Sequence, residues 1–286
     1  MQLVIISGKG GTGKTTITAS FAYLSEQSIK CDCDVDASNL HIVLGGEDIK
    51  KEHYIGAKVA KIDYDKCVNC KACENICRFD AIENGIVNEL KCEGCAACTV
   101  VCRYNAITMN DEITGETIVT KTNRGILSRA SMIAGAEGSG KLVTDVRKNA
   151  FNYGSKDDLY ILDGTPGVGC AVMASITGCD LALIVVEPSQ SGLNDFKRVL
   201  SVTNHFQIKS LVCINKYDIN EELTNEIIEF CNQNDIEVIG KIPFDSIVEQ
   251  SINELKPIVL YEESLASKEI KNIWNKIIKY ISRRNF

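Results

Sequence analysis

A duplicated run of cysteines limits, more than any other feature, what this chain can fold into. Cysteines follow the spacing Cys-x2-Cys-x2-Cys-x3-Cys from Cys67 to Cys77, and the same spacing recurs 25 residues later from Cys92 to Cys102. These runs contain eight of the 14 cysteines in the 286-residue chain. Disulfides are rare in reducing compartments, where clustered cysteines usually bind metal. We therefore expect a duplicated metal-binding module within a larger chain.

The segment from Asp63 to Asn110 resembles bacterial ferredoxins with two 4Fe–4S clusters. In that pattern the fourth cysteine of each run binds the cluster of the other run. Arg78 and Arg103 stand where the ferredoxin pattern has proline, and a guanidinium near a thiolate would raise a cluster's potential. The resemblance implies one cluster on Cys67, Cys70, Cys73 and Cys102, and a second on Cys77, Cys92, Cys95 and Cys98.

Two other interpretations of these cysteines stay open. One is zinc, because four-cysteine zinc sites also use Cys-x2-Cys pairs; zinc ligands come as two separated pairs, however, and not as triplets. The other is a purely structural role for the clusters, since a segment of 48 residues can hardly fold without metal. The spacing favours iron–sulfur clusters over zinc.

The N-terminal segment predicts a phosphate-binding loop between a strand and a helix. Gly8-Lys9-Gly10-Gly11-Thr12-Gly13-Lys14-Thr15 matches G-x-x-x-x-G-K-T, in which backbone N–H groups surround phosphates, the lysine reaches the β and γ oxygens and the threonine faces Mg²⁺. The same glycines fit the dinucleotide pattern G-x-G-x-x-G. Lys14 and Thr15 have no role in a dinucleotide site, and Asp163 ends an apolar strand as a Walker-B acid would. The sequence therefore favours a nucleoside triphosphate site.

Apolar runs and helical periodicities alternate along the rest of the chain, which indicates a parallel sheet with helices on both faces. We predict a doubly wound, mostly parallel α/β domain of the P-loop NTPase class, residues 1–62 and 111–286, with a small α+β ferredoxin-like domain inserted at 63–110. The strands are expected at Gln2–Ile6, Ile29–Cys31, Glu116–Thr120, Leu159–Asp163, Leu181–Glu187, Ser210–Asn215 and Glu237–Ile242. The helices are expected at Thr15–Leu24, Lys141–Asn152, Gly192–His205, Glu221–Asn232 and Ser264–Ile281.

Lys9 gives the phosphate loop the form of the deviant Walker A sequence, and the chain here resembles the MinD-like P-loop ATPases. That class includes the nitrogenase iron protein, ParA partition ATPases and Mrp-type iron–sulfur carriers. The resemblance continues through Asp32–Asn39, Asp163–Gly167, Glu187–Gly192 and Ile214–Asp218. Together with the cysteine module it covers nearly the whole chain, which resembles MinD-superfamily ATPases with an inserted ferredoxin domain.

The resemblance implies a role for each matching residue. Lys14 would bind phosphates in its own subunit, and Lys9 would reach the partner's phosphates across an ATP sandwich dimer. Asp34 would orient the attacking water, and it would surround the Mg²⁺ together with Thr15 and Asp163. Further nucleotide contacts are implied for Gly8, Gly10, Gly11, Thr12, Gly13 and Thr16 in the loop, for Gly167 at the γ-phosphate, and for Asn215, Pro243 and Phe244 at the adenine. For Asp32 we expect a supporting role behind the Mg²⁺ ligands, and for Asp36 a plain loop charge.

Charge and hydropathy bear on whether the protein binds nucleic acid or spans a membrane. Acidic residues outnumber basic residues 38 to 31, so a broad basic face for nucleic acid is not expected. No apolar run approaches the ~18 residues that span a bilayer. Met1–Ser7 lacks the charged region and cleavage site of a signal peptide, so we expect a cytoplasmic protein.

The last helix is amphipathic, and we expect it to cover the sheet rather than contact a membrane. Its apolar face carries Ile270, Ile273, Trp274, Ile277, Ile278 and Ile281, and its basic face carries Lys268, Lys271, Lys276, Lys279, Arg283 and Arg284.

The six cysteines outside the module carry weaker signals. Cys31, Cys179, Cys213 and Cys231 lie in apolar or amphipathic settings, where cysteine acts as a small hydrophobe. Cys33 lies within the Asp32–Asn39 segment and Cys170 lies just past the Asp163–Gly167 segment, so both could approach a cluster, but neither belongs to a Cys-x2-Cys pair.

We therefore expect a Mg²⁺-dependent ATPase that couples its nucleotide state to electron transfer through two 4Fe–4S clusters. Its expected partners are a redox or metallocofactor-assembly protein and a second ATPase subunit, in a homodimer or in a heterodimer with a similar chain. The alternatives are an ATP-dependent iron–sulfur carrier or scaffold, and a nucleotide-switched positioning protein with a structural ferredoxin module.

Overall fold

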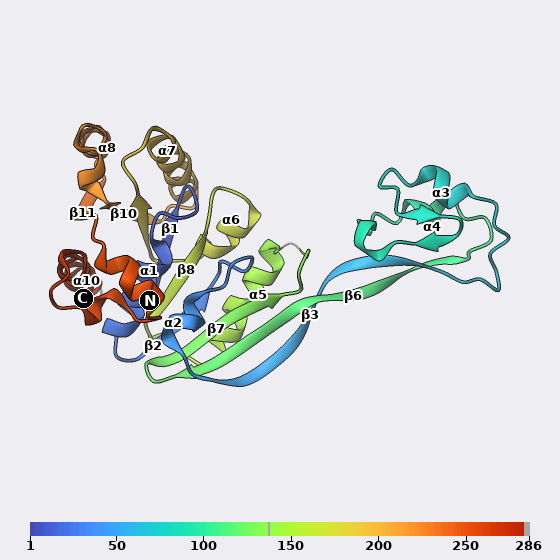
Figure 1. Ribbon diagram of the computed structural model, residues 1–286, viewed down its shortest axis with the longest axis horizontal. Coiled ribbons are helices and arrows are strands. Elements are labelled where there is room, and N and C mark those ends of the chain that lie inside the picture. The colour runs from blue at the N-terminus through green and yellow to red at the C-terminus, as the bar shows by residue number, and fades with distance from the viewer. Residues whose placement is uncertain (137, 283–286) are drawn as a thin grey trace. The chain divides into compact units, whose positions relative to one another are not determined.

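Nine strands form one sheet in the order β11-β10-β9-β1-β8-β2-β7-β6-β3 (Figure 1). The computed structural model describes residues 1–136 and 138–282. The pairs of neighbouring strands from β11 through β7 are all parallel. Their bounds are β1 Gln2–Ser7, β2 Ser28–Asp32, β7 Gly125–Met132, β8 Tyr160–Pro166, β9 Leu181–Val186, β10 Lys209–Asn215 and β11 Glu237–Ile242. The mostly parallel α/β sheet predicted from the alternating pattern is therefore present.

The chain forms two compact units. The large unit comprises Met1–Lys51, Thr117–Ser131 and Gly138–Phe286, and the small unit comprises Glu52–Glu116 and Met132–Glu137. The small unit contains the whole of the predicted insert, 63–110, and begins before it. The small unit is larger than the predicted insert because two long strands contribute residues to both units. These strands are β3 Glu47–Ile62 and β6 Ile107–Thr122.

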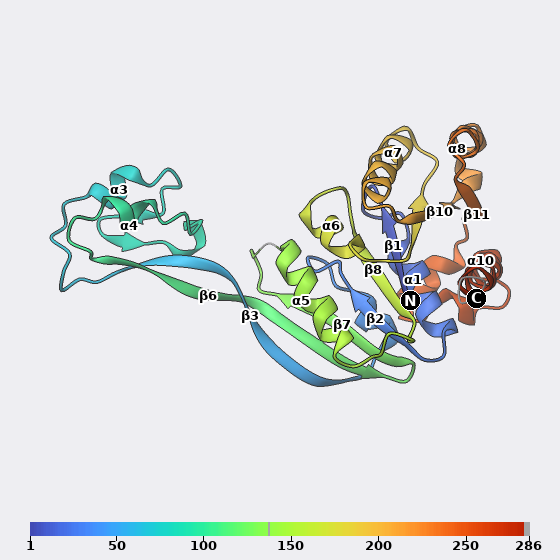
Figure 2. The same ribbon diagram turned by 180° about the vertical axis from the view of Figure 1, so that it is seen from behind.

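Helices cover both faces of the parallel strands in the large unit. α1 and α10 lie on one side, and α5, α6 and α7 lie on the other (Figures 1 and 2). Alternate residues of β1 serve the two faces: Leu3 and Ile5 pack with Phe21 of α1, whereas Val4 and Ile6 are buried on the other side. The helices are α1 Lys14–Leu24, α2 Leu40–Leu44, α5 Gly140–Phe151, α6 Cys170–Ile176, α7 Gln190–His205, α8 Glu221–Gln233, α9 Ile247–Asn253 and α10 Leu265–Ser282, with short 3-10 turns η2 Tyr217–Ile219 and η3 Ile258–Leu260.

The apolar face of α10 packs into the core, as predicted. Ile270, Ile273 and Ile277 are buried, and the Trp274 ring lies 5.0 Å from the ring of Phe21 between centroids. This burial uses the apolar stripe that a membrane would otherwise require. No helix in residues 1–136 and 138–282 is both long and apolar enough to cross a membrane. Arg283 and Arg284, assigned to the basic face, lie outside the described residues.

The connection through the small unit differs most from the expected elements. A short hairpin-like strand was expected at Glu116–Thr120, but β6 has 16 residues and pairs with the equally long β3. Charged residues interrupt both strands, so neither shows the continuous apolar run of the parallel strands. We attribute their length to pairing with each other. A sequence pattern read one segment at a time does not reveal such pairing.

The small unit repeats its backbone with the same 25-residue offset as its sequence. Its elements are α3 Ala72–Ile76, β4 Ile82–Glu83, β5 Ile86–Val87, η1 Glu89–Lys91 and α4 Ala97–Val101. Lys71 before α3 and Ala96 before α4 both have φ +61°. The turns that follow the helices also correspond, with φ +51° at Asp80 and +49° at Asn105. The two halves therefore adopt the same local fold.

Candidate nucleotide site and cysteine cavities

The sheet brings the carboxyl ends of β1, β8 and β2 together, and the predicted nucleotide residues follow these strands. The loop after β1 carries Gly8 to Gly13 and leads directly into α1. Ligands bind at this edge of an open parallel sheet because loops from neighbouring strands diverge there. The fold thus gathers the phosphate loop and the acidic segments at one place.

Two glycines of the phosphate loop adopt a backbone that other residues avoid. Gly11 has φ +77° and Gly13 has φ +90°. Gly13 is also confined, because a Cβ there would lie 2.5 Å from the amide nitrogen of Asn215. Gly8 is confined as well, because a Cβ there would lie 2.3 Å from the Cβ of Asp195 in α7. The loop is therefore packed against α7 and against the last residue of β10.

Asp163 receives two hydroxyl groups from α1. Thr15 donates a hydrogen bond of 2.7 Å to one carboxylate oxygen, and Thr18 donates one of 2.8 Å to the other. Burial raises the pKa of Asp163, and these bonds together with the Lys14 charge oppose the rise. Thr15 and Asp163, the two predicted Mg²⁺ ligands in this part of the site, are thus in direct contact.

Asp32 lies beside Asp163 in the register of β2 and β8. It is 1% exposed, and its pKa is raised by burial and by the charge of Asp163. Its Oδ2 accepts from the Ser38 hydroxyl and the Leu40 N–H, whereas its buried Oδ1 has no hydrogen-bond partner within the described residues. An unpaired buried carboxylate oxygen next to Asp163 suits a cation or its bound water.

Asp34 and Asp36 occupy different settings in the loop after β2. Burial raises the pKa of Asp34 to about 6, with the nearby Lys14 charge opposing the rise. Asp34 therefore lies in the same electrostatic field as Lys14 and Asp163. Asp36 instead accepts a 2.7 Å hydrogen bond from the Gly138 N–H, which is the loop role expected for it.

The residues assigned to the γ-phosphate and adenine lie at three places: the loop after β8, the end of β10 and the loop after β11. Gly167, with φ +95°, donates its N–H to the carbonyl of Ser7, which ties the loop after β8 to the start of the phosphate loop. The Asn215 amide donates 2.9 Å to the Thr12 carbonyl, so one of its groups is already bonded to the phosphate loop. Phe244 is 58% exposed and follows the half-buried Pro243. Thr16 lies in the first turn of α1.

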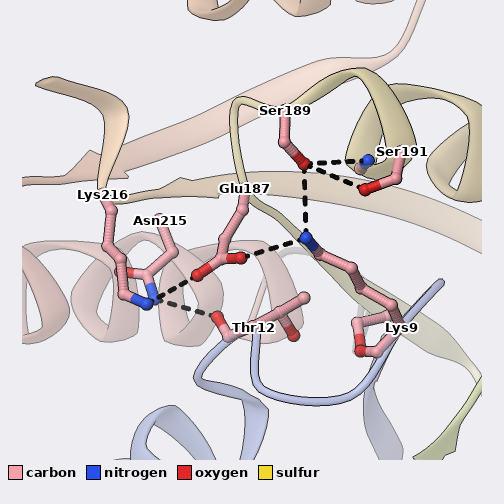
Figure 3. Close-up of polar contacts among 9 residues, drawn as sticks. Lys9, Thr12, Glu187, Ser189, Ser191, Asn215 and Lys216 are labelled. Carbon is pink, nitrogen blue, oxygen red and sulfur yellow. Dashed lines mark hydrogen bonds and ion pairs between the residues drawn. The ribbon is translucent and has the colours of Figure 1, made fainter. Parts of the chain in front are cut away.

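The side chain of Lys9 contacts two residues of its own chain, Glu187 and Ser189, to which the sequence analysis assigned no role. Its Nζ lies 3.4 Å from Glu187 Oε2 and donates 3.2 Å to the Ser189 hydroxyl (Figure 3). The other oxygen of Glu187 lies 2.6 Å from Lys216 Nζ. The sequence did contain a signal for Glu187. This acid directly follows an apolar strand, and Asp32, which the sequence analysis did consider, likewise ends a strand.

The eight clustered cysteines line two cavities of the small unit in two sets of four. Each set lines a cavity of its own. Backbone N–H groups of Ala81 and Ala106 lie 3.4 Å from the sulfurs of Cys77 and Cys102, again at equivalent positions of the repeat. The first cavity has Cys67, Cys70, Cys73 and Cys102, and the second has Cys77, Cys92, Cys95 and Cys98.

No group of three or more His, Cys, Asp and Glu side chains, across 1–136 and 138–282, is arranged to hold a single metal ion. The other cysteines are mostly buried. Burial raises the pKa of both Cys31 and Cys213 to about 12, so these thiols stay protonated and pack as small apolar groups. Cys33 is fully buried as well, whereas Cys170 is exposed at the start of α6.

Comparison with known proteins places this architecture among nucleotide-binding domains. Residues 3–258 match the family model described as the CobQ/CobB/MinD/ParA nucleotide binding domain. An uncharacterized protein of Methanocaldococcus jannaschii is 34% identical over 284 residues, covering 98% of both chains. An iron–sulfur cluster carrier protein of Pyrococcus horikoshii is 26% identical over 156 residues, covering 49% of this chain and 52% of that protein.

Solved structures share the fold. The septum site-determining protein MinD of Pyrococcus horikoshii, complexed with Mg-ADP, superposes with a TM-score of 0.60 and 20% identity over 98% of this chain and 96% of that one. The predicted α/β P-loop fold with a mostly parallel sheet is therefore confirmed.

Proposed function

Because this chain belongs to the CobQ/CobB/MinD/ParA family of nucleotide-binding ATPases, we propose that it couples Mg-ATP hydrolysis to electron transfer through two 4Fe–4S clusters in its small unit. The electrons would serve a partner metalloprotein or the assembly of a metallocofactor. The single observation that carries this proposal is the division of eight cysteines into two cavities with four in each.

The nucleotide half of the proposal rests on the phosphate loop and the acids beside it. Thr15 and Asp163, already 2.7 Å apart, would hold Mg²⁺, with Asp34 approaching it from the loop after β2. The buried oxygens Thr12 Oγ1 and Asp32 Oδ1 have no hydrogen-bond partner within the described residues, which fits a site built for a polar ligand. Mg²⁺ would neutralise phosphate charge there.

The hydrolytic step then depends on residues of this chain. Lys14 would bind the β and γ oxygens, and Asp34 would orient the attacking water. Lys9 would add a second cation to the partner's phosphates when two subunits close around the nucleotides, where charge accumulates in the transition state. The closed dimer would form with a second copy or with a similar ATPase.

The cysteine cavities fit four-iron clusters better than single ions. A cubane carries its thiolates at the corners of a cube, so they lie further apart than the four ligands of one zinc ion. Four cysteines line each cavity, and the described residues contain no group of three or more His, Cys, Asp and Glu side chains placed to hold a single ion, which agrees with a larger cluster. The clusters would supply one-electron chemistry. The Ala81 and Ala106 N–H groups would tune it through the cysteine sulfurs.

A second function, ATP-timed delivery of a cluster, is favoured by one comparison. The relative named an iron–sulfur cluster carrier protein matches about half of this chain. In a carrier the clusters would be cargo and would leave the protein after hydrolysis. Transfer to an apo-ferredoxin acceptor, measured with and without ATP, would separate this function from electron transfer.

The direct test begins with anaerobic purification and analysis of iron and acid-labile sulfide. The proposal expects two four-iron clusters per chain, and Cys70→Ser should lower the iron content while Cys170→Ser, at an exposed cysteine of the large unit, should not. Midpoint potentials are then measured with MgADP and with a non-hydrolysable ATP analogue. A shift of ~59 mV would equal ~1.4 kcal/mol of coupling between nucleotide and cluster. Iron-free protein, or clusters that dithionite does not reduce, would refute electron transfer.

A further inference from the structure

A hollow on the surface of the small unit lies against the first cysteine cavity. Its wall is formed by α3, by the end of α4 and by the two residues that follow Cys102. The two helices lie side by side (Figure 1). The hollow shares Cys70, Ala72 and Tyr104 with the first cavity, whereas none of its lining residues lines the second. A molecule seated in the hollow would therefore touch a wall of the first cavity and not of the second.

Arg103 gives the hollow a positive charge that the chain does not neutralise. The residue is exposed, and its guanidinium has no ion-pair or hydrogen-bond partner in the described part of the chain. The acid of α3, Glu74, is already engaged, because it accepts from the Asn84 N–H and pairs with Lys71 at 3.9 Å. A guanidinium presents a fork of donors that binds a carboxylate through two hydrogen bonds. The hollow therefore suits a carboxylate supplied from outside the chain.

The corresponding arginine of the other half is arranged differently. Arg78 occupies the equivalent position 25 residues earlier, and its guanidinium carbon lies 5.1 Å from the centre of the Phe79 ring. Phe79 lines the second cavity, so this cation–π contact keeps Arg78 on its own half. Arg103 makes no such ring contact within the described residues. The two halves share a backbone fold, but one of their two arginines is engaged and the other is free.

Most of the remaining wall of the hollow is apolar, which favours a protein as the occupant over a small anion. Ile76 is 45% exposed and Tyr104 is 50% exposed. Tyrosine and arginine are enriched where protein interfaces bind most strongly, in surroundings that exclude water. A small inorganic anion would gain from the guanidinium but nothing from the apolar side chains. The occupant that fits is a protein surface with a carboxylate flanked by apolar side chains.

We propose that an electron-accepting partner protein docks in this hollow with a surface carboxylate on Arg103, so that electrons leave the chain from the first cavity. The inference rests on the proposed electron transfer. Cys70 would lie on the path, because it lines both the hollow and the cavity. One electron would pass from a reduced cluster to a metal centre of the partner, and no covalent bond would form or break.

Two c-type cytochromes, one acidic and one basic, serve as protein probes of the exit. The anaerobically purified chain is reduced with dithionite, freed of excess reductant and mixed with each ferric cytochrome, and haem reduction is followed by absorbance. Each transfer moves one electron from the chain to one ferric haem. Arg103→Gln should slow reduction of the acidic cytochrome roughly 2- to 5-fold, which is the effect of one partly exposed ion pair, and should not slow the basic one.

Arg78→Gln is the matched control, since it removes the same charge at the equivalent position of the other half. It should leave both rates unchanged. Both arginines are exposed, so the iron content should be the same in the two variants and in the wild-type chain.

Docking is measured separately on the oxidised chain, in which no electron moves. The acidic cytochrome should protect Arg103, but not Arg78, from an arginine-specific reagent, as read by mass spectrometry. Equal protection by inorganic phosphate would make the hollow a small-anion site and would overturn the proposal.

The rates have their own refuting outcomes. An unchanged rate in Arg103→Gln, or equal slowing in the two arginine variants, would overturn the assigned exit. A wild-type chain that dithionite does not reduce would refute the proposed electron transfer instead, and the protection of Arg103 would then decide the docking alone.

Discussion

Replacing Gly13 by alanine should cost more than replacing either neighbouring glycine of the phosphate loop, because Gly13 is constrained twice. Its φ is +90°, and a Cβ would lie 2.5 Å from the Asn215 amide nitrogen that bonds to the Thr12 carbonyl. Gly11 has φ +77° but open space around it, and Gly10 is open with an ordinary φ. The three positions therefore separate backbone strain from steric conflict.

The expected free energies of unfolding follow from these contacts. Gly10→Ala should be neutral or slightly stabilising. Gly11→Ala should cost about 1 kcal/mol, which is the left-handed strain less the entropy gained from a stiffer unfolded chain. Gly13→Ala should cost about 2 kcal/mol, because it also breaks the Asn215 hydrogen bond, worth about 1 kcal/mol.

A double-mutant cycle identifies the cause. Asn215→Ala alone should cost about 1 kcal/mol, and the double variant should cost no more than Gly13→Ala, a coupling of about 1 kcal/mol. Urea unfolding followed by tryptophan fluorescence suits the measurement, since Trp274 is the only tryptophan and is buried in the large unit. Equal costs for Gly11→Ala and Gly13→Ala, or full additivity with Asn215→Ala, would refute the reasoning.

Three further predictions address binding, hydrolysis and pH. Lys14→Ala should abolish nucleotide binding in equilibrium titration and keep the iron content of the protein, because the cysteines lie in the other unit; loss of iron would contradict this independence. Asp34→Ala should bind ATP, hydrolyse it slowly and accumulate as a dimer by size-exclusion chromatography, and normal turnover would exclude the assigned role. Burial, reinforced by the Arg124 charge, lowers the pKa of Lys30 from 10.5 to about 7. Since the unfolded chain then binds more protons than the folded chain from pH 7 upward, the free energy of unfolding should rise by roughly 2 kcal/mol between pH 7 and pH 9. Urea unfolding should show that slope in the wild-type chain and lose it in Lys30→Met; equal slopes would disprove the effect.

The sequence predicted the parallel strands well because their signal is local. β1 and β9 each contain at least four consecutive apolar residues, and the structure places both strands close to the expected residues. The two cysteine runs were equally easy to recognise, because a fixed spacing repeated at a fixed offset needs no tertiary information. Both features depend on neighbours in the chain.

What the sequence did not predict depends on neighbours in space. β3 and β6 are long because they pair with each other, and their mixed composition hides this. The contact of Glu187 with Lys9 and Lys216 depends on the order of strands in the sheet, since the three residues come from loops far apart in the chain. A motif search finds each segment but not the carboxylate that lies between two of them.

The exchange of cysteines between the two halves of the small unit bears on how such a module could arise. Each cavity takes three cysteines from one half and the fourth, Cys102 or Cys77, from the other. A half-length peptide could complete neither cavity by itself. Two identical copies, each lending its fourth cysteine to the other, would complete both. The equivalent turns at Asp80 and Asn105 are what such an ancestral pair would leave behind after its genes fused. Because each half contributes cysteines to both cavities, loss of the cysteines of one half would leave both cavities incomplete.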